Sequence, residues 1–171
     1  MIALLEIELE GFLSSTLATV VGGLTLAIIV FFIREKVCPV PNVNGRWYFE
    51  MKSLKTAFNP YRNMVLRYEV MLWREGMAIR GTAEKFYEFT HESGTKEYVG
   101  PERTRAKVEG FIQKNYLGKD RIIIHIVENG HGRESTNFHE LKFESKVKMN
   151  GHFTSMVAKQ SGNVTWQRTP F

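Results

Sequence analysis

Apolar residues follow two different patterns along the chain, and the pattern changes near residue 40. Residues 12–33 form an apolar run without a charged side chain, whereas beyond residue 45 apolar and polar residues alternate in short stretches that end at Gly, Pro or Asn. An uninterrupted run of about 20 residues is typical of a transmembrane helix. Alternation with a period of two is typical of a strand with one buried face. The sequence therefore predicts one membrane helix followed by a β-rich domain.

The predicted helix is long enough to cross a bilayer, because the 22 residues of 12–33 rise by about 1.5 Å each against a hydrocarbon layer of about 30 Å. Arg34 and Lys36 follow the run, and only glutamates precede it. The positive-inside rule then places the N-terminus outside and the following domain in the cytoplasm. The acidic start and the long apolar run disfavour a cleaved signal peptide.

Small residues recur every four positions in this helix, at Ser15, Thr19, Gly23 and Ala27. Such a stripe lets a second helix approach closely, and it therefore predicts self-association. Small residues are also common in membrane helices that do not associate, and the pattern leaves that alternative open.

The sequence of the domain that follows the helix predicts eight strands. Turn residues separate them, including Gly76, Gly118, Gly130 and Gly162. The predicted strands cover 46–54, 64–74, 77–89, 103–113, 121–128, 134–143, 146–159 and 163–169. Successive strands of this length favour an all-β fold, an eight-stranded antiparallel up-and-down barrel. The chain divides into a tail and helix at 1–37, a Pro-containing linker at 38–45 and a barrel at 46–171.

The connections of a meander alternate between its two ends, and the end at which the first strand begins is expected to face the membrane. The other end receives the two longest loops, 55–63 and 90–102, and barrels commonly place ligand sites there. Guanidinium groups bind phosphate and stack on bases, so the basic and aromatic residues collected there are candidates for ligand binding. The candidates are Arg62, Tyr87, Arg103, Arg105, His131 and Arg133. The alternative is that they are ordinary solvated loop residues.

The charge distribution favours an anionic partner. None of the 23 basic residues precedes Arg34, while three of the 18 acidic residues do, so residues 34–171 carry a net +8. No motif of a hydrolase, metalloprotease or nucleotide-dependent enzyme is present, and the five histidines lack zinc-ligand spacing. Cys38 is the only cysteine. We therefore expect a binding protein without catalytic residues, metal or cofactor. No strand carries the stripe of aromatic residues that DNA- or RNA-binding platforms require, so neither is expected as a partner.

Gly45 and Trp47 have an expected structural role at the start of the first strand. Glycine permits close approach of another chain segment, and a tryptophan at this position can plug the end of the barrel, provided its indole N–H finds a partner.

Three short motifs give the domain a family resemblance. They are Pro41-Asn42-Val43-Asn44-Gly45-Arg46-Trp47; His131-Gly132 followed by Gly151-His152-Phe153-Thr154; and Gly162-Asn163-Val164-Thr165-Trp166-Gln167-Arg168. Together they resemble the membrane β-barrel effectors of bacterial anti-phage CBASS systems, also described as SMODS-associated transmembrane β-strand-rich effectors. The likeness extends over about residues 39–169.

The resemblance implies a lipocalin-like barrel at the bacterial inner membrane that binds a cyclic dinucleotide made by a partner nucleotidyltransferase. Ligand binding is then expected to drive homo-oligomerisation and disruption of the membrane. The family is typically described with two membrane helices, whereas this chain shows one. Two alternatives from other classes remain: a membrane-tethered, lipocalin-like carrier of an apolar ligand, and a scaffold whose barrel binds a protein.

Overall fold

The computed structural model describes the backbone of residues 2–130 and 134–171, and within these ranges the side chains from residue 11 onward. The chain forms two compact units. One ends at Val40 and the other comprises Pro41–Phe171. Each unit is described by itself.

The first unit is a single helix, α1 (Ile2–Phe32), which continues for one π-helical turn, η1 (Ile33–Val37). The segment Gly11–Val37 is long and apolar enough to cross a membrane. Within the small-residue stripe, the Thr19 hydroxyl donates to the Ser15 carbonyl at 2.9 Å, so this polar group is satisfied inside its own helix. The association of helices through this stripe stays a prediction.

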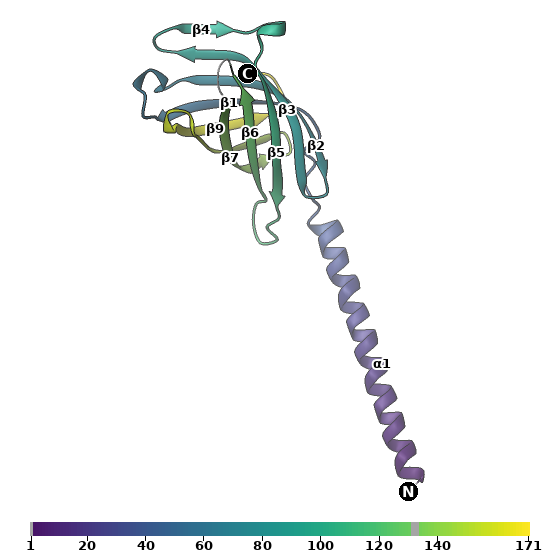
Figure 1. The fold of residues 1–171 in the computed structure, drawn as a ribbon. Helices are drawn as coiled ribbons and strands as arrows, with labels where there is room; N and C mark the ends of the chain where they lie inside the picture. The colour runs from purple at the N-terminus through teal and green to yellow at the C-terminus, as the bar shows by residue number, and fades with distance from the viewer. Residues whose placement is uncertain (1, 131–133) are drawn as a thin grey trace. The chain divides into compact units, whose positions relative to one another are not determined.

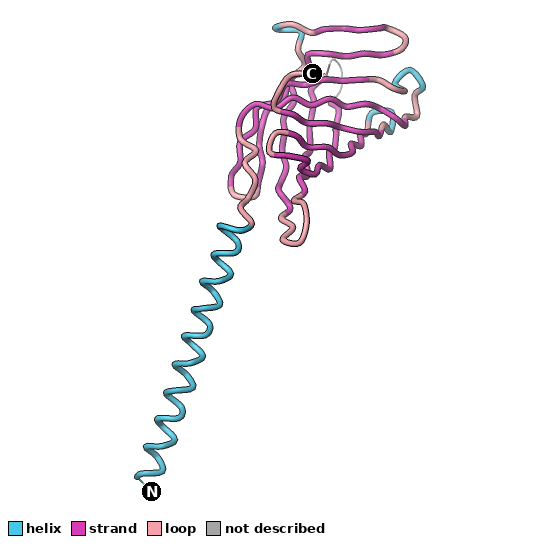
Figure 2. The backbone as a smooth tube through the Cα atoms, turned by 180° about the vertical axis from the view of Figure 1, so that it is seen from behind, coloured by secondary structure: helices cyan, strands magenta, loops and turns pink. Residues whose placement is uncertain are grey.

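The second unit is a closed barrel, which confirms the predicted fold. Each barrel strand pairs antiparallel with the barrel strands before and after it in the chain, and the last strand pairs with the first (Figures 1 and 2). The barrel strands are β1 (Gly45–Lys55), β2 (Val65–Glu75), β3 (Ala78–Thr90), β5 (Arg105–Gln113), β6 (Arg121–Asn129), β7 (Glu134–Ser145), β8 (Lys148–Ser155) and β9 (Ser161–Gln167). Short 3-10 turns lie at η2 (Asn59–Tyr61), η3 (Gly100–Glu102) and η4 (Val157–Lys159).

Two details differ from the sequence prediction. A ninth strand, β4 (Gly94–Glu97), lies within the expected loop 90–102 and pairs with the end of β3, so that the two form an arm that projects beyond the barrel (Figure 1). The strand predicted at 146–159 ends at Ser155 instead, because Ala158 and Lys159 adopt positive φ angles of 52° and 47° that turn the chain.

The barrel has two distinct ends. The linker end contains the start of β1 and the turns β2–β3, β5–β6 and β7–β8. The distal end contains the other connections and the β3–β4 arm. The predicted alternation of connections between the two ends is therefore present.

The linker end is closed by Trp47, which is fully buried. Its indole N–H donates to the Val43 carbonyl at 2.8 Å, and the Arg168 guanidinium lies 4.0 Å from its ring centroid. Arg168 also donates to the carbonyls of Asn44 at 2.8 Å and Arg46 at 3.0 Å. Gly45 has φ +97°, and a Cβ there would lie 3.3 Å from the Arg168 guanidinium. Both residues thus occupy the structural positions that the sequence predicts.

The interior changes from apolar to polar between the two ends. The inward positions of β1 run Trp47, Phe49, Met51 and Ser53 from the linker end to the distal end. Phe49 stacks between Tyr68 and Trp166, with centroid distances of 4.5 and 4.6 Å. This aromatic layer fills the middle of the barrel, so the space that remains inside lies toward the distal end.

Other strands repeat this change of polarity. The inward residues of β6 are Ile122, Ile124 and Ile126, and then Glu128. Along β3, the inward Ile79, Gly81 and Ala83 are followed by Lys85. Buried polar side chains are normally paired or placed for function, so the distal interior is where a functional site is expected.

Candidate ligand-binding cavity

A cavity of about 230 Å³ lies in the distal end of the barrel. Met51 and Tyr68 line it on the side of the aromatic layer, and Tyr61, Val157 and Gln160 come from or adjoin the distal connections. Its lining mixes apolar side chains with carboxylates, amides, hydroxyls and one ammonium group. A cavity of this composition fits a small polar ligand better than a lipid chain.

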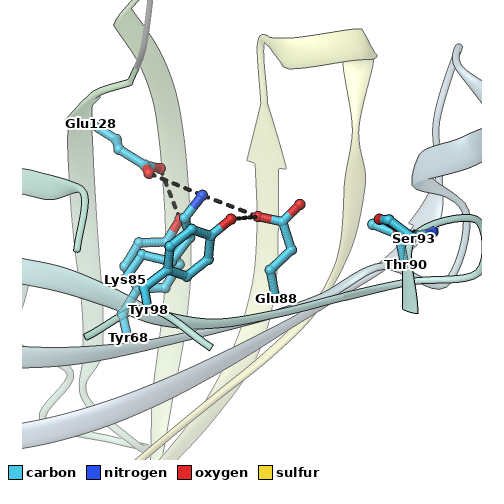
Figure 3. A network of polar contacts seen from close by, with 7 residues as sticks. All are labelled: Tyr68, Lys85, Glu88, Thr90, Ser93, Tyr98 and Glu128. Atoms are coloured by element: carbon cyan, nitrogen blue, oxygen red, sulfur yellow. Dashed lines mark hydrogen bonds and ion pairs between the residues drawn. The ribbon is translucent and has the colours of Figure 1, made fainter. Parts of the chain in front are cut away.

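Lys85 is at the centre of a polar network in this cavity (Figure 3). Its ammonium lies 3.2 Å from a Glu88 carboxylate oxygen and 3.6 Å from one of Glu128. The Tyr68 hydroxyl donates to Glu128 at 2.8 Å, and the Tyr98 hydroxyl donates to Glu88 at 3.0 Å. The network therefore joins the wall of the barrel to Tyr98, which follows the β4 arm.

Burial and the two carboxylates set the charges of this network. Burial raises the pKa of Tyr68 well above its usual value, and the neighbouring Glu128 raises it further, so the phenol is neutral. Burial alone lowers the pKa of Lys85, but the charges of Glu128 and Glu88 outweigh it and the net shift is upward. Lys85 is therefore a cation held between two acidic side chains. With both carboxylates ionised, the three groups together carry one negative charge.

A β-bulge in β3 brings the two acidic groups to the same cavity. Tyr68 of β2 pairs with Lys85 and Arg67 pairs with Tyr87, so Phe86 has no partner and the alternation shifts by one position. Glu88 then faces inward, while Tyr87 faces outward. Without this bulge, strict alternation from Lys85 would turn Tyr87 into the cavity and Glu88 out of it.

The distal connections around the cavity carry exposed charged side chains of both signs. Arg62, Lys96 and Lys159 come from three distal connections, are exposed, and make no ion pair with a carboxylate among the described residues. The Lys96 ammonium lies 4.8 Å from the Tyr98 ring centroid. The site thus combines two carboxylates and one ammonium group inside with unpaired basic side chains on the connections around it.

The structure separates the predicted ligand-binding residues. Arg62 lies at the rim. Tyr87 lies on the outer wall, where the Arg67 guanidinium stacks 4.5 Å from its ring centroid. Arg103 and Arg105 also lie on the outer wall: Arg103 pairs with Glu69 at 3.3 Å, and Arg105 with Glu84 at 3.3 Å. The expectation that these three residues share a cavity with Arg62 is not met, because their side chains point away from the barrel interior.

His131 and Arg133, the last two predicted ligand-binding residues, lie outside the described residues. The groups that do line the cavity, Lys85, Glu88 and Glu128 above all, were not among the predicted site residues. A signal for Glu128 exists in the sequence. It continues the inward series of Ile122, Ile124 and Ile126, and a charged residue in such a series marks a buried polar site.

His139 lies in the layer beneath the cavity. It is fully buried, and its Nδ1 accepts a hydrogen bond from the Trp166 indole at 3.3 Å. The ring proton is therefore on Nε2, which has no hydrogen-bond partner among the described residues. Burial lowers the pKa of His139 to about 3, so the imidazole is neutral at physiological pH.

Comparisons with known proteins support the fold alone. No family model and no curated protein sequence matches the chain. Among solved structures, a redesigned β-barrel is similar at 12% identity, with a TM-score of 0.52 over 75% of this chain and 92% of that one. A second redesigned barrel, mFAP1 bound to DFHBI, is similar at 11% identity, with a TM-score of 0.52 over 74% of this chain and 94% of that one. Both likenesses agree with a closed barrel.

Proposed function

We propose that this protein is a membrane-anchored receptor whose barrel binds a small polar ligand in the distal cavity. The observation that carries the proposal is the charged network of Lys85, Glu88 and Glu128, which lines a cavity inside the barrel. The apolar segment Gly11–Val37 serves as the anchor, with the barrel in the cytoplasm because Arg34 and Lys36 follow the segment's apolar part.

The chemistry of the cavity favours a nitrogen heterocycle as the part of the ligand that enters. Carboxylates accept hydrogen bonds from ring and exocyclic N–H groups, and Asn137 and Gln160 supply amides that both donate and accept. A cavity of about 230 Å³ is smaller than the roughly 300–1,000 Å³ typical of pockets that enclose a whole drug-sized ligand. One base therefore fits the interior better than an entire dinucleotide.

Phosphate groups belong at the rim in this proposal. A phosphate inside would meet one cation against two carboxylates, whereas Arg62, Lys96 and Lys159 on the distal connections are exposed basic groups that no ion pair occupies among the described residues. This division agrees with the resemblance to the CBASS effectors, whose ligand is a cyclic oligonucleotide. We therefore propose a cyclic oligonucleotide as the ligand, with a base in the cavity and its phosphates at the rim.

Ligand binding then shifts the protein toward an assembly that disrupts the inner membrane. A ligand can do this only if it binds the assembled state more tightly than the monomer. Tyr98 connects the ligand site to the projecting arm, because its hydroxyl donates to Glu88 in the cavity and the residue directly follows β4. The stripe at Ser15, Thr19, Gly23 and Ala27 would supply the contact between helices.

A thermal-shift screen of the full chain in nanodiscs tests the proposal. The panel contains cyclic dinucleotides, cyclic trinucleotides, linear nucleotides and fatty acids. A ligand at 100 times its Kd should stabilise the barrel by about 2.7 kcal/mol. The proposal fails if no cyclic oligonucleotide shifts the transition. Stabilisation by fatty acids alone, or co-purified lipid in native mass spectra, would instead favour a carrier of apolar ligands.

A further inference from the structure

The linker end of the barrel exposes an apolar side chain at each of its three turns. Met77 of the β2–β3 turn, Leu117 of the β5–β6 loop and Val147 of the β7–β8 turn are 36%, 101% and 57% exposed. Tyr116, beside Leu117, is exposed as well. Figure 1 shows the β2–β3 turn and the β5–β6 loop extending from the same end of the barrel. Exposed apolar side chains on all three turns of one barrel end make this end a candidate for contact with a membrane.

The most prominent of these loops is held in shape by its own hydrogen bonds. The Asn115 side chain accepts from the Leu117 backbone N–H at 3.2 Å. Asp120 accepts from the Asn115 backbone N–H at 2.9 Å and pairs with Lys114 at 2.8 Å. The loop therefore presents Leu117 to the surroundings in a defined conformation.

The same turns carry basic side chains that form no ion pair with a carboxylate among the described residues. Each of their acidic side chains has a basic partner: Glu75 with Arg80 at 3.7 Å, Asp120 with Lys114 at 2.8 Å, and Glu144 with Lys148 at 3.0 Å. Among the described residues, Arg74, Lys119 and Lys146 make no ion pair with a carboxylate. Apolar tips surrounded by unpaired basic groups match an anionic lipid surface, which attracts each nearby Lys or Arg.

Few residues connect the helix to the segment that is bound to the linker end of the barrel. Arg168 donates to the carbonyls of Asn42 and Asn44, and the Asn44 side chain accepts from the Arg74 backbone N–H, so residues 42–44 are bound to the barrel. Only residues 38–41 remain between them and Val37, a distance of at most about 18 Å. The headgroup layer adds about 5–7 Å on each side of the hydrocarbon.

Exposed apolar residues also occur at the distal end, where Val99 is 73% and Met156 is 82% exposed. The 11 residues of β1 separate the two ends by roughly 25–30 Å along the barrel axis, given about 3.4 Å per residue and a tilt near 40°. The tether therefore holds the linker end, and not the distal end, at high effective concentration next to the bilayer.

We propose that the linker end docks on the anionic lipid surface, with Leu117 inserted among the headgroups and Lys119 and Lys146 bound to lipid phosphates. This inference rests on the membrane anchoring in the proposed function and is independent of any ligand. Docking turns the distal cavity away from the bilayer, where a soluble ligand can reach it.

Spin labels on the full chain test the docking. Cys38→Ser removes the native thiol, and Leu117→Cys or, as the matched control at the distal end, Met156→Cys introduces one label each. In vesicles of phosphatidylcholine and phosphatidylserine, the label at 117 should be more accessible to oxygen and less accessible to a water-soluble nickel chelate than the label at 156. Charge reversal by Lys119→Glu and Lys146→Glu should lower the docked-to-undocked ratio about fivefold or more for each lysine, and vesicles of phosphatidylcholine alone should lower it as well.

The outcomes separate docking from anchoring. If alkaline extraction leaves the chain in the membrane and both labels are equally exposed to water, the docking proposal is wrong while the anchor stands. If alkaline extraction releases the chain, the anchoring fails and the docking proposal fails with it. Docking that persists in phosphatidylcholine alone and after both charge reversals would overturn the assignment to anionic lipid.

Discussion

Acidification should destabilise the barrel through His139. Above pH 6.5 the imidazole is neutral in both the folded and the unfolded state. Because burial holds the folded pKa at about 3, only the unfolded state takes up a proton as the pH falls below 6.5. The contribution of the neutral His139 to the unfolding free energy is therefore fully present well above pH 6.5 and is lost as the pH falls toward 3. At pH 5 the loss is about 2 kcal/mol relative to pH 7.5, and at pH 3 it is about 4 kcal/mol.

His139→Gln removes this titration while keeping an oxygen that can accept the Trp166 indole bond. We expect the loss of unfolding free energy between pH 7.5 and pH 5 to be about 2 kcal/mol smaller in this variant than in the wild type. Urea unfolding of the full chain in a mild detergent, followed by tryptophan fluorescence, measures the difference. His152→Gln, at an exposed position of β8, is the control and should follow the wild type. Equal pH dependence in wild type and His139→Gln would refute the reasoning that the aromatic layer excludes protonation.

Three further substitutions test the architecture. Trp47→Ala empties the plug of the linker end and should cost about 3–5 kcal/mol of unfolding free energy in the same urea assay. Gly151→Ala should cost at least about 1–3 kcal/mol, because its Cβ would collide with the Glu140 backbone carbonyl of the neighbouring strand; a wild-type midpoint would contradict that packing. Gly23→Ile should weaken helix association in a membrane two-hybrid assay, whereas Gly22→Ile, which lies off the stripe, should not. Equal signals for both variants would show that the stripe does not mediate helix association.

The strands and the closure of the barrel could be predicted because they depend on a local signal, the alternation of apolar and polar residues. The short β4 could not, since Gly94–Glu97 contains no apolar alternation and is a strand only because β3 extends beyond the barrel to pair with it. Strand pairing of this kind is set by tertiary context, which overrides local propensity.

The candidate site was harder to predict than the fold, for two reasons. The bulge at Phe86 reverses the faces of Tyr87 and Glu88, and no sequence motif announces it. The second reason is that loop position does not determine which way a side chain points. Arg105 faces outward by ordinary strand alternation, because the neighbouring Ala106 faces inward. Lys85 and Glu128 lie at inward positions of β3 and β6 and not in loops, so loop position and charge do not predict them.

Isothermal titration of the full chain with the stabilising cyclic oligonucleotide tests the central claim most directly. Glu128→Gln keeps the size of a side chain inside the cavity but removes its charge, whereas Glu84→Gln makes the same change on the outer wall. We predict that Glu128→Gln weakens binding at least tenfold, about 1.4 kcal/mol, and that Glu84→Gln binds like the wild type. Equal affinity of the wild type and Glu128→Gln, or no heat with any cyclic oligonucleotide, would contradict a receptor that reads its ligand in the distal cavity.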